Sequence, residues 1–171
     1  MKASQPELDV DVVLAHVRYD PKTGEIRWKK VPLRSRKAEV GSVADYATLN
    51  GYRVVYLLGR WVYSHRIAWA SAWMVWPSGV IDHINRNPGD NRWANLRLAT
   101  RSQNQCNHKR REDNRSGFKG VGWSIQKGMW RVRVRFCGKE HHGGFFNELD
   151  DAVRAATKLR QKHQGKFANH G

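Results

Sequence analysis

Three side chains in the middle of the sequence have the types and spacing that phosphodiester hydrolysis requires. Asp82 and His83 end a short apolar run, and Asn104 follows a Thr100-x-x-Gln103 pair that has the spacing of a helix capping box. A strand, a polar loop and the first turn of a helix can bring an acid, an imidazole and an amide oxygen to one point. Mg²⁺ prefers oxygen ligands, and imidazole is suited to take a proton from water near neutral pH. The pattern therefore predicts metal-assisted hydrolysis.

Each of these residues also has an ordinary structural interpretation. Asp82 could cap a turn, His83 could be a partly buried histidine, and Asn104 could be a polar residue at a helix end. For any one of them taken alone, this interpretation is favoured. The polar side chains of the intervening loop are interpreted as turn and cap residues rather than metal ligands: Asn85, Asn87, Asp90 and Asn91.

The segment from His65 to Asn107 favours the catalytic interpretation over the structural one, because it resembles a known family. It reads HRIAWA…VIDHINRNPGDNRWANLRLATRSQNQCN and is similar to the HNH endonucleases of the phage and intron homing type. The resemblance implies a ββα-metal (His-Me finger) fold and DNA cleavage with one divalent ion, Mg²⁺ or Mn²⁺, per site. It further implies that His83 is the general base and that Asp82 and Asn104 bind the metal. Asn95 would brace the loop and orient the histidine.

Other residues of this segment are less specific. His65 fits the pattern of the family without a chemical role that the sequence reveals, and a packed or phosphate-facing histidine is expected. Three arginines are candidates for contacts to DNA phosphates: Arg66, Arg92 and Arg97. For Arg92 and Arg97, simple solvation is an equally good interpretation.

The elements that must position the motif are predicted from hydrophobic periodicity. Apolar residues three and four apart predict a helix near residues 10–17. Two β-rich runs, 52–57 and 60–63, flank a Leu-Gly turn and predict a hairpin. A buried helix follows from Ile67 and ends before Pro77; its tryptophans, Trp69 and Trp73, are assigned to packing.

A second unit is predicted at residues 116–171. Strands are expected at 118–123, 129–136 and 140–146, followed by a helix capped by Asn147. The predicted architecture is a small three-stranded antiparallel sheet packed on one helix.

The middle strand of this unit predicts contact with nucleic acid. Arg131, Arg133 and Arg135 alternate with apolar residues, so the three arginines share one face of the sheet. Such a face is a solvated surface in most proteins, but residues 109–171 carry 15 Lys and Arg against 6 Asp and Glu, a formal charge of +9. A β-sheet can lie in the major groove, where arginine binds guanine edges.

This C-terminal stretch also resembles the APETALA or ethylene-response-factor DNA-binding domain. The resemblance rests on Gly120-Val121, Trp130, Gly144-Phe145-Phe146 and the segment 165–169. It implies that the first two strands contact duplex DNA, through Lys119, Trp123, Arg131, Arg133 and Arg135. Gly122 and Arg133 depart from the residues of plant members, so the base preference of that family does not transfer.

The whole chain has 171 residues and a formal net charge of +16, which predicts a polyanionic partner. We expect an α+β protein with a leader of one helix and a short strand at 1–42, an HNH nuclease domain at 43–108, a linker at 109–115 and a DNA-binding domain at 116–171. The charge is spread over both halves, because residues 1–108 also carry a formal charge of +7.

Several classes of protein are excluded or disfavoured by composition. No apolar run is long enough for a membrane span, and no signal peptide is recognisable, so a cytoplasmic protein is expected, in the host cell if the gene belongs to a phage. Cys106 and Cys137 are too far apart for a zinc knuckle and are expected to be reduced. The expected partner is double-stranded DNA, bound by a monomer or weak dimer.

Two other functions remain open from the sequence. The first is a non-catalytic DNA-binding regulator that retains the nuclease fold. The second is an RNA-binding protein, which is disfavoured because no aromatic strand motif of the RNA-recognition type occurs. The target sequence, and whether the product is nicked or broken on both strands, are not encoded in any recognisable pattern.

Overall fold

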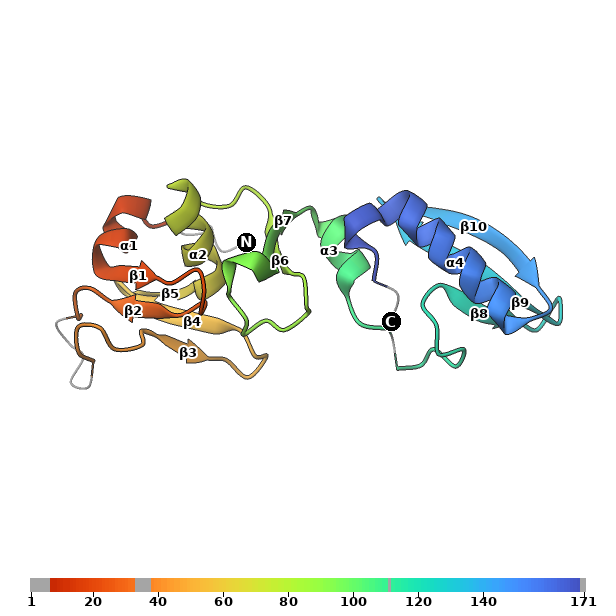
Figure 1. Ribbon diagram of the computed structural model, residues 1–171, viewed down its shortest axis with the longest axis horizontal. Helices are drawn as coiled ribbons and strands as arrows, with labels where there is room; N and C mark the ends of the chain where they lie inside the picture. The colour runs from red at the N-terminus through yellow and green to blue at the C-terminus, as the bar shows by residue number, and fades with distance from the viewer. Residues whose placement is uncertain (1–6, 33–37, 111, 170–171) are drawn as a thin grey trace. The chain divides into compact units, whose positions relative to one another are not determined.

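The structure is a computed structural model of the chain, and it describes residues 7–32, 38–110 and 112–169. The chain divides into two compact units, Met1–Leu98 and Ala99–Gly171. Figure 1 shows both units with their helices and strands. Each unit is described separately below.

The first unit combines short helices with three small sheets. Its helices are α1 (Val10–His16), α2 (Ser64–Trp73) and the 3₁₀ turn η1 (Trp93–Asn95). Its strands are β1 (Val17–Tyr19), β2 (Ile26–Trp28), β3 (Asp45–Ala47), β4 (Arg53–Leu57), β5 (Arg60–Tyr63), β6 (Val80–His83) and β7 (Leu96–Ala99), the last of which reaches the unit boundary. β1 pairs with β2, β6 pairs with β7, and the third sheet has the order β3-β4-β5.

The predicted helix and hairpin are confirmed. Asp9 caps α1, because its side chain accepts a hydrogen bond of 2.8 Å from the backbone N–H of Asp11. The hairpin turns at Leu58 and Gly59, which have φ of 51° and 84°. Positive φ at both central residues is the requirement of a two-residue turn whose twist matches its strands.

The N-terminal segment shares its core with the hairpin and α2. Eight buried residues form this core: Val13, Val17, Ile26, Trp28, Ala44, Val55, Leu57 and Ile67. Backbone bonds also tie β2 to the segment before β3, with Ala44 N–H donating to Ile26 O at 2.7 Å. Residues of the predicted leader therefore fold together with the predicted nuclease domain and contribute to the same core.

The second unit contains the predicted three strands and helix. Its elements are α3 (Arg101–Asn107), β8 (Val121–Ser124), β9 (Met129–Phe136), β10 (Lys139–Phe146), α4 (Leu149–Gln164) and the 3₁₀ turn η2 (Gly165–Phe167). The sheet is antiparallel in the order β10-β9-β8, and α4 crosses it (Figure 1). The predicted cap Asn147 is wrong by one residue, because α4 begins after Glu148, which makes no capping side-chain bond.

Helix α3 packs within this second unit. The Lys119 ammonium donates to the carbonyl oxygens of Cys106 and His108 at 2.9 and 2.6 Å, and Ser102 Oγ accepts from Cys137 N–H at 2.8 Å. These contacts, with a small core that includes Phe167, explain why the compact units divide at Leu98 rather than at the predicted linker 109–115.

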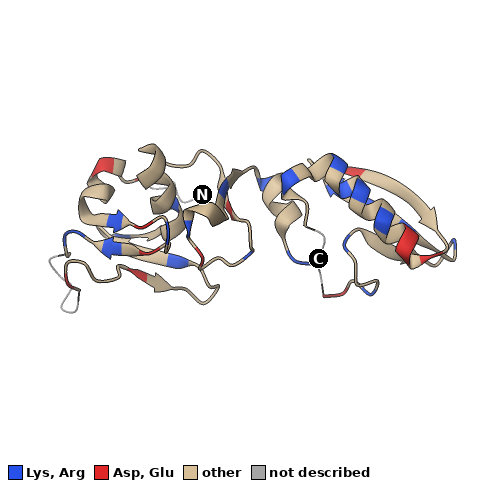
Figure 2. Ribbon diagram, viewed as in Figure 1, with Lys and Arg blue, Asp and Glu red and all other residues tan. Residues whose placement is uncertain are grey.

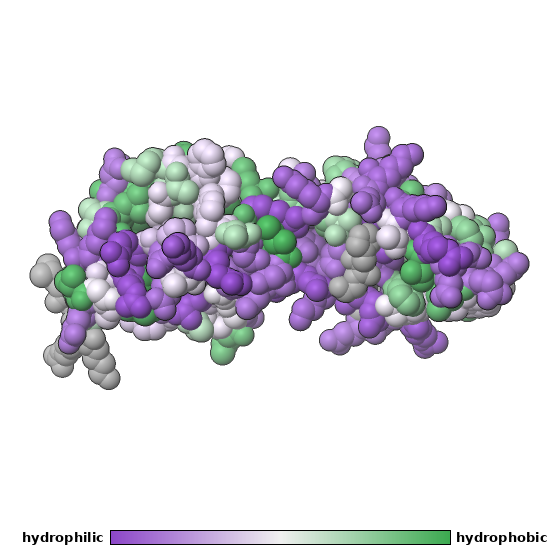
Figure 3. All heavy atoms as spheres, in the orientation of Figure 1, coloured by the Kyte–Doolittle hydropathy of each residue, from purple (hydrophilic) through white to green (hydrophobic). Residues whose placement is uncertain are grey.

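Charge and hydropathy follow the elements. Lys and Arg recur along α4, whereas acidic residues gather at its first turn (Figure 2). Hydrophilic side chains dominate the visible face of each unit (Figure 3). Among the described residues, no helix has the length and apolar character that a membrane crossing would require.

Candidate active site

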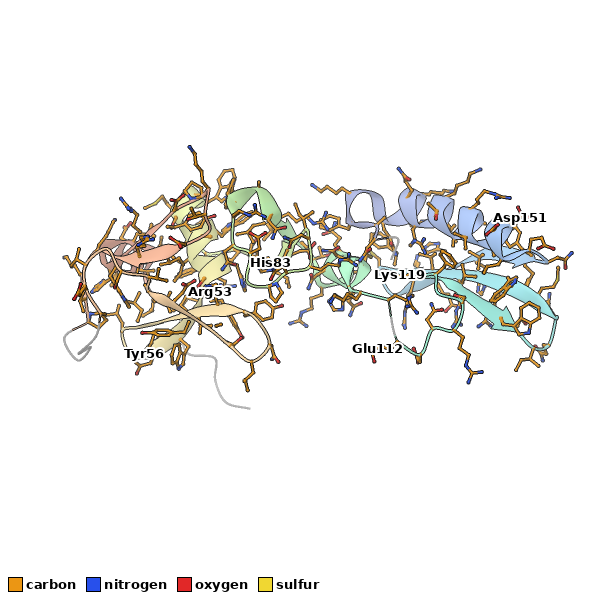
Figure 4. All side chains as sticks on the ribbon, turned by 60° about the horizontal axis from the view of Figure 1, so that its bottom comes forward. Arg53, Tyr56, His83, Glu112, Lys119 and Asp151 are labelled. Carbon is orange, nitrogen blue, oxygen red and sulfur yellow. The ribbon has the colours of Figure 1, made fainter. Side chains whose placement is uncertain are left out.

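His83 ends β6 and is held by a buried asparagine. The His83 Nε2 atom lies 3.0 Å from Asn91 Oδ1, and the two residues are 6% and 1% exposed. An amide oxygen only accepts, so Nε2 is the donor in this hydrogen bond. Figure 4 shows His83 inside the first unit. This contact orients the imidazole.

Asn91 is itself supported by the turn between β1 and β2. The Tyr19 hydroxyl donates to the Asn91 carbonyl oxygen at 2.7 Å, and Trp93 N–H donates to Pro21 O at 3.0 Å. Burial raises the pKa of Tyr19, with Asp20 and Asp90 adding to the effect, so the hydroxyl stays a donor. The N-terminal segment therefore positions the loop that holds His83.

Asn95 braces the same loop from its other end. Its amide nitrogen donates to Asp90 O at 2.7 Å, and its amide oxygen accepts from Asn85 N–H at 2.9 Å. Asp90 also accepts from Arg92 Nε at 2.8 Å, and this side-chain bond is the main cause that lowers the pKa of Asp90 to about 2. The loop is thus closed by hydrogen bonds across ten residues.

Asp82 lies beside His83 in the chain and forms a buried ion pair. Its Oδ2 atom accepts from Arg97 Nε at 2.7 Å, and Arg97 Nη2 lies at the same distance. The side chains are 4% and 14% exposed. Arg97, predicted as a phosphate contact, is therefore engaged with the predicted metal ligand in this structure.

His65 packs against His83. The two rings meet edge to face with centroids 5.4 Å apart, and Tyr63 stacks on His65 at 5.2 Å. Burial lowers the pKa of His65 to about 3, and the nearby His83 and Arg66 add to this shift. Its Nδ1 atom is buried and has no hydrogen-bond partner among the residues that the structure describes. The structure therefore places His65 as a neutral, packed histidine next to the candidate base.

The Asp82 carboxylate suits a hard cation such as Mg²⁺ rather than a metal that is enclosed by several protein ligands. Within the described ranges, no group of three or more His, Cys, Asp and Glu side chains could hold a metal. Mg²⁺ needs fewer protein ligands than that, because it binds through one or two carboxylates and keeps water and phosphate ligands. The Asp82 carboxylate fits that requirement, although a bound ion would share it with Arg97.

Two further residues predicted from the motif, Asn104 and Arg66, lie in different parts of the fold. Asn104 lies half-buried on α3, in the second unit, whereas Asp82, His83 and Asn95 belong to the first. Arg66 pairs with Glu7 and lies over the Trp76 ring, 5.6 Å from its centroid.

The predicted DNA-binding residues of the second unit lie on or near its sheet. Arg133 and Arg135 are exposed on β9 and Arg131 is half-buried, while the alternating valines are buried. Trp123 is 51% exposed and meets Trp130 edge to face at 5.0 Å. The predicted alternation is therefore confirmed, whereas the Lys119 ammonium is occupied by backbone carbonyls of α3 and the residue after it.

One supporting residue, Asn91, is not distinguished by the sequence. Its local pattern indicates only a loop cap, because four polar residues of the same loop have equivalent patterns. Its complete burial is the distinguishing property, and burial depends on the β1–β2 turn, about 70 residues earlier in the chain.

Comparisons with known proteins identify relatives of this chain. A family model described as HNH endonuclease matches residues 62–106. Protein 3.8 of Escherichia phage T7 is 37% identical over 107 residues, which cover 61% of this chain and 86% of the phage protein. No solved structure matches the chain at a significant level. The chain thus belongs to the family of phage T7 Protein 3.8 and contains an HNH endonuclease domain at residues 62–106.

Proposed function

We propose that this protein is a divalent-metal-dependent DNA endonuclease of the phage HNH homing type, and that His83 is its general base. The observation that carries the proposal is the buried imidazole at the end of β6, which is oriented by Asn91 and directly follows Asp82 in the chain. These residues lie within the segment that matches the HNH endonucleases. A fixed imidazole can act as the base, and an acidic side chain can bind a metal ion, in the hydrolysis of a phosphodiester.

The chain's own groups have distinct roles in the proposed reaction. Nδ1 of His83 takes a proton from the attacking water, while Nε2 keeps its bond to Asn91. Asn95 keeps the loop closed, so that the imidazole does not reorient between turnovers. A divalent ion held by Asp82 would supply positive charge to the phosphate and the leaving oxygen.

The second unit is proposed to bind the duplex. The exposed arginines of β9 and the exposed Trp123 provide cationic and aromatic groups on one small sheet. Arginine offers bidentate hydrogen bonds to guanine or phosphate. One site per chain would nick one strand, and cleavage of both strands would need a dimer or two events.

One observation favours a second candidate, a non-catalytic DNA-binding regulator. Arg97 occupies an oxygen of the Asp82 carboxylate in a buried ion pair. An arginine in that place supplies fixed positive charge where a metal ion would act. Under this alternative the protein binds DNA and leaves it intact.

Cleavage of DNA tests the two candidates against each other. Wild-type protein is incubated with supercoiled plasmid and with genomic DNA of the encoding source, in Mg²⁺, in Mn²⁺ and in EDTA. We expect nicked or linear product that depends on the metal and is absent with His83→Ala. Equal activity of wild type and His83→Ala contradicts the endonuclease proposal, and binding of intact DNA without cleavage under all conditions supports the regulator.

A further inference from the structure

The outer face of the β3-β4-β5 sheet carries a set of aromatic side chains, here called the aromatic strip. It consists of Tyr46, Tyr52, Tyr56, Trp61 and Tyr63. Trp61 meets Tyr46 edge to face at 6.3 Å and lies against Tyr56, its cross-strand partner, at 5.0 Å. Trp61 and Tyr63 are two residues apart on β5 and so share a face of the sheet.

These rings are exposed rather than packed into the core. Trp61 is 61% exposed, and each tyrosine of the aromatic strip is between 37% and 56% exposed. The opposite face of the same sheet provides the buried core residues Val55 and Leu57. A contiguous exposed aromatic surface of this kind marks an interaction site, because burial on folding does not explain it.

The aromatic strip continues into the candidate active site. Tyr52 contacts Tyr63 at 5.6 Å, and it also meets the His83 ring edge to face at 6.1 Å. Tyr63 stacks on His65, which in turn contacts His83. A ligand lying along the aromatic strip would therefore lead to the imidazole. In Figure 4, Tyr56 lies at the outside of the unit and His83 further in.

A cavity at the free edge of β5 adds cationic groups to this surface. Its volume is about 310 Å³, and it is lined by Trp61, Tyr63 and Trp76 together with Arg60, Arg66 and Glu7, the carboxylate that pairs with Arg66. Aromatic rings beside guanidinium groups match the two parts of a nucleotide, since bases stack on rings and phosphates pair with arginine. A purely apolar protein partner would not use this combination.

We propose that the aromatic strip stacks on unpaired bases of a DNA strand whose backbone leads to His83. Every base has a flat π face, so stacking needs no particular sequence. The bases of an intact duplex are already stacked on each other, which leaves the aromatic strip selective for single-stranded, gapped or locally melted DNA. The inference rests on the proposed function for the identity of the ligand, and it narrows the substrate from duplex DNA in general to duplex DNA that also presents unpaired bases.

Equilibrium binding separates this inference from catalysis. Fluorescence anisotropy is measured in EDTA with a single-stranded oligonucleotide, a gapped duplex and an intact duplex. We expect Trp61→Ala to weaken binding of the first two about tenfold and to change binding of the intact duplex less than about twofold. Trp61→Phe keeps a ring and retains most of the affinity. Trp73→Ala is the matched control, because Trp73 is 60% exposed but lies on α2, outside the aromatic strip.

Three results would overturn the inference. The first is unchanged affinity of Trp61→Ala for all three DNAs. The second is an equal loss on intact and single-stranded DNA, which indicates a general contact surface. The third is a change in oligomeric state by sedimentation velocity without a change in DNA binding, which indicates a protein interface. If the protein does not cleave plasmid DNA but Trp61→Ala still weakens binding to DNA with unpaired bases, the result contradicts the proposed nuclease but not the stacking surface.

Discussion

Asn91 connects the candidate base to the rest of the first unit. Its side chain contacts His83 and its carbonyl oxygen accepts from Tyr19, so a single buried residue transmits the position of the N-terminal turn to the imidazole. The Asn91 Oδ1 atom is hydrogen-bonded, whereas its Nδ2 atom is buried with no hydrogen-bond partner among the described residues. Because such burial is costly, it suits a residue retained for orientation. Asn91 acts through His83 and is a positioning residue.

Replacement of Asn91 tests this role. Asn91→Ala removes the acceptor that fixes the imidazole, and we expect the single-turnover cleavage rate to fall about 10-fold to 100-fold while DNA affinity is unchanged. Asn50→Ala, at an exposed turn, is the control. Parallel losses of rate and affinity would contradict a positioning role.

His65 predicts a dependence of stability on pH. Its pKa of about 3 in the folded state lies below the ordinary value of 6.5, so the unfolded chain takes up the proton first as the pH falls. The free energy of unfolding contributed by this residue is complete above pH 6.5 and declines by about 1.4 kcal/mol per pH unit below it, until pH 3 is reached.

Urea unfolding at a series of pH values measures this effect. His65→Gln cannot titrate and should give a shallower slope between pH 6.5 and 4 than the wild type, whatever its stability at neutral pH. His108→Gln removes an exposed histidine and should keep the wild-type slope. Equal slopes for wild type and His65→Gln would show that His65 is not held neutral by burial.

At the scale of elements, some helices and turns depend on local hydrogen bonds, and others depend on contacts with residues far along the chain. The capping box of α3 is local: Thr100 Oγ1 accepts from Gln103 N–H at 3.2 Å, and Gln103 Oε1 accepts from Thr100 N–H at 2.8 Å. The β1–β2 turn is different, because its role depends on a loop far along the chain. A Cβ atom at Gly24 would lie 2.6 Å from Arg92 N and from Asn91 C.

Gly24→Ala tests the contact between this turn and the active-site loop. The residue has φ of +78°, and the added methyl group would also push the Asn91 backbone, so both stability and cleavage rate should fall. Gly41→Ala is a matched control, since Gly41 has φ of +86° and a Cβ atom added there would meet nothing within 4 Å. We expect an additional loss of at least about 1 kcal/mol for Gly24→Ala in urea unfolding. Equal losses would contradict the contact.

At the scale of the whole molecule, the net charge of +16 predicts DNA affinity that falls steeply with salt. Two arginines of β9, Arg133 and Arg135, are exposed on the sheet face away from α4, whereas Lys158 and Lys162 are exposed on α4 itself. The two pairs carry the same charge on different surfaces. Substitution of each pair therefore shows whether DNA contacts the β9 face specifically or is attracted by the positive charge of the whole protein.

Double substitutions to glutamine test that distinction. If the β9 arginines contact phosphates, their removal should reduce the slope of log K against log salt by about 2, or about 0.9 for each contact. The Lys158 and Lys162 substitutions should have a smaller effect on the slope. Binding is measured by anisotropy with intact duplex between low and moderate salt. The same reduction for both pairs would contradict the assignment of β9 as the DNA-binding face.

The sequence by itself determined the local elements and the position of the motif. The capping box of α3, the Leu58-Gly59 turn and the alternation on β9 were predictable because each depends on residues within a few positions of one another. The neighbouring pair Asp82 and His83 was recognisable for the same reason. These features follow from backbone geometry and from the periods of helices and strands.

Only the tertiary structure decided which polar residues are buried and what they contact. Among the similar asparagines of one loop, it is Asn91 whose carbonyl oxygen accepts a hydrogen bond from the Tyr19 hydroxyl. Arg97 forms its ion pair with Asp82 because β6 and β7 are paired strands. Trp73, assigned to packing from its helical position, is instead exposed. Burial and ion pairing depend on residues far apart in the chain, because desolvation is a property of the packed surroundings and not of the local sequence.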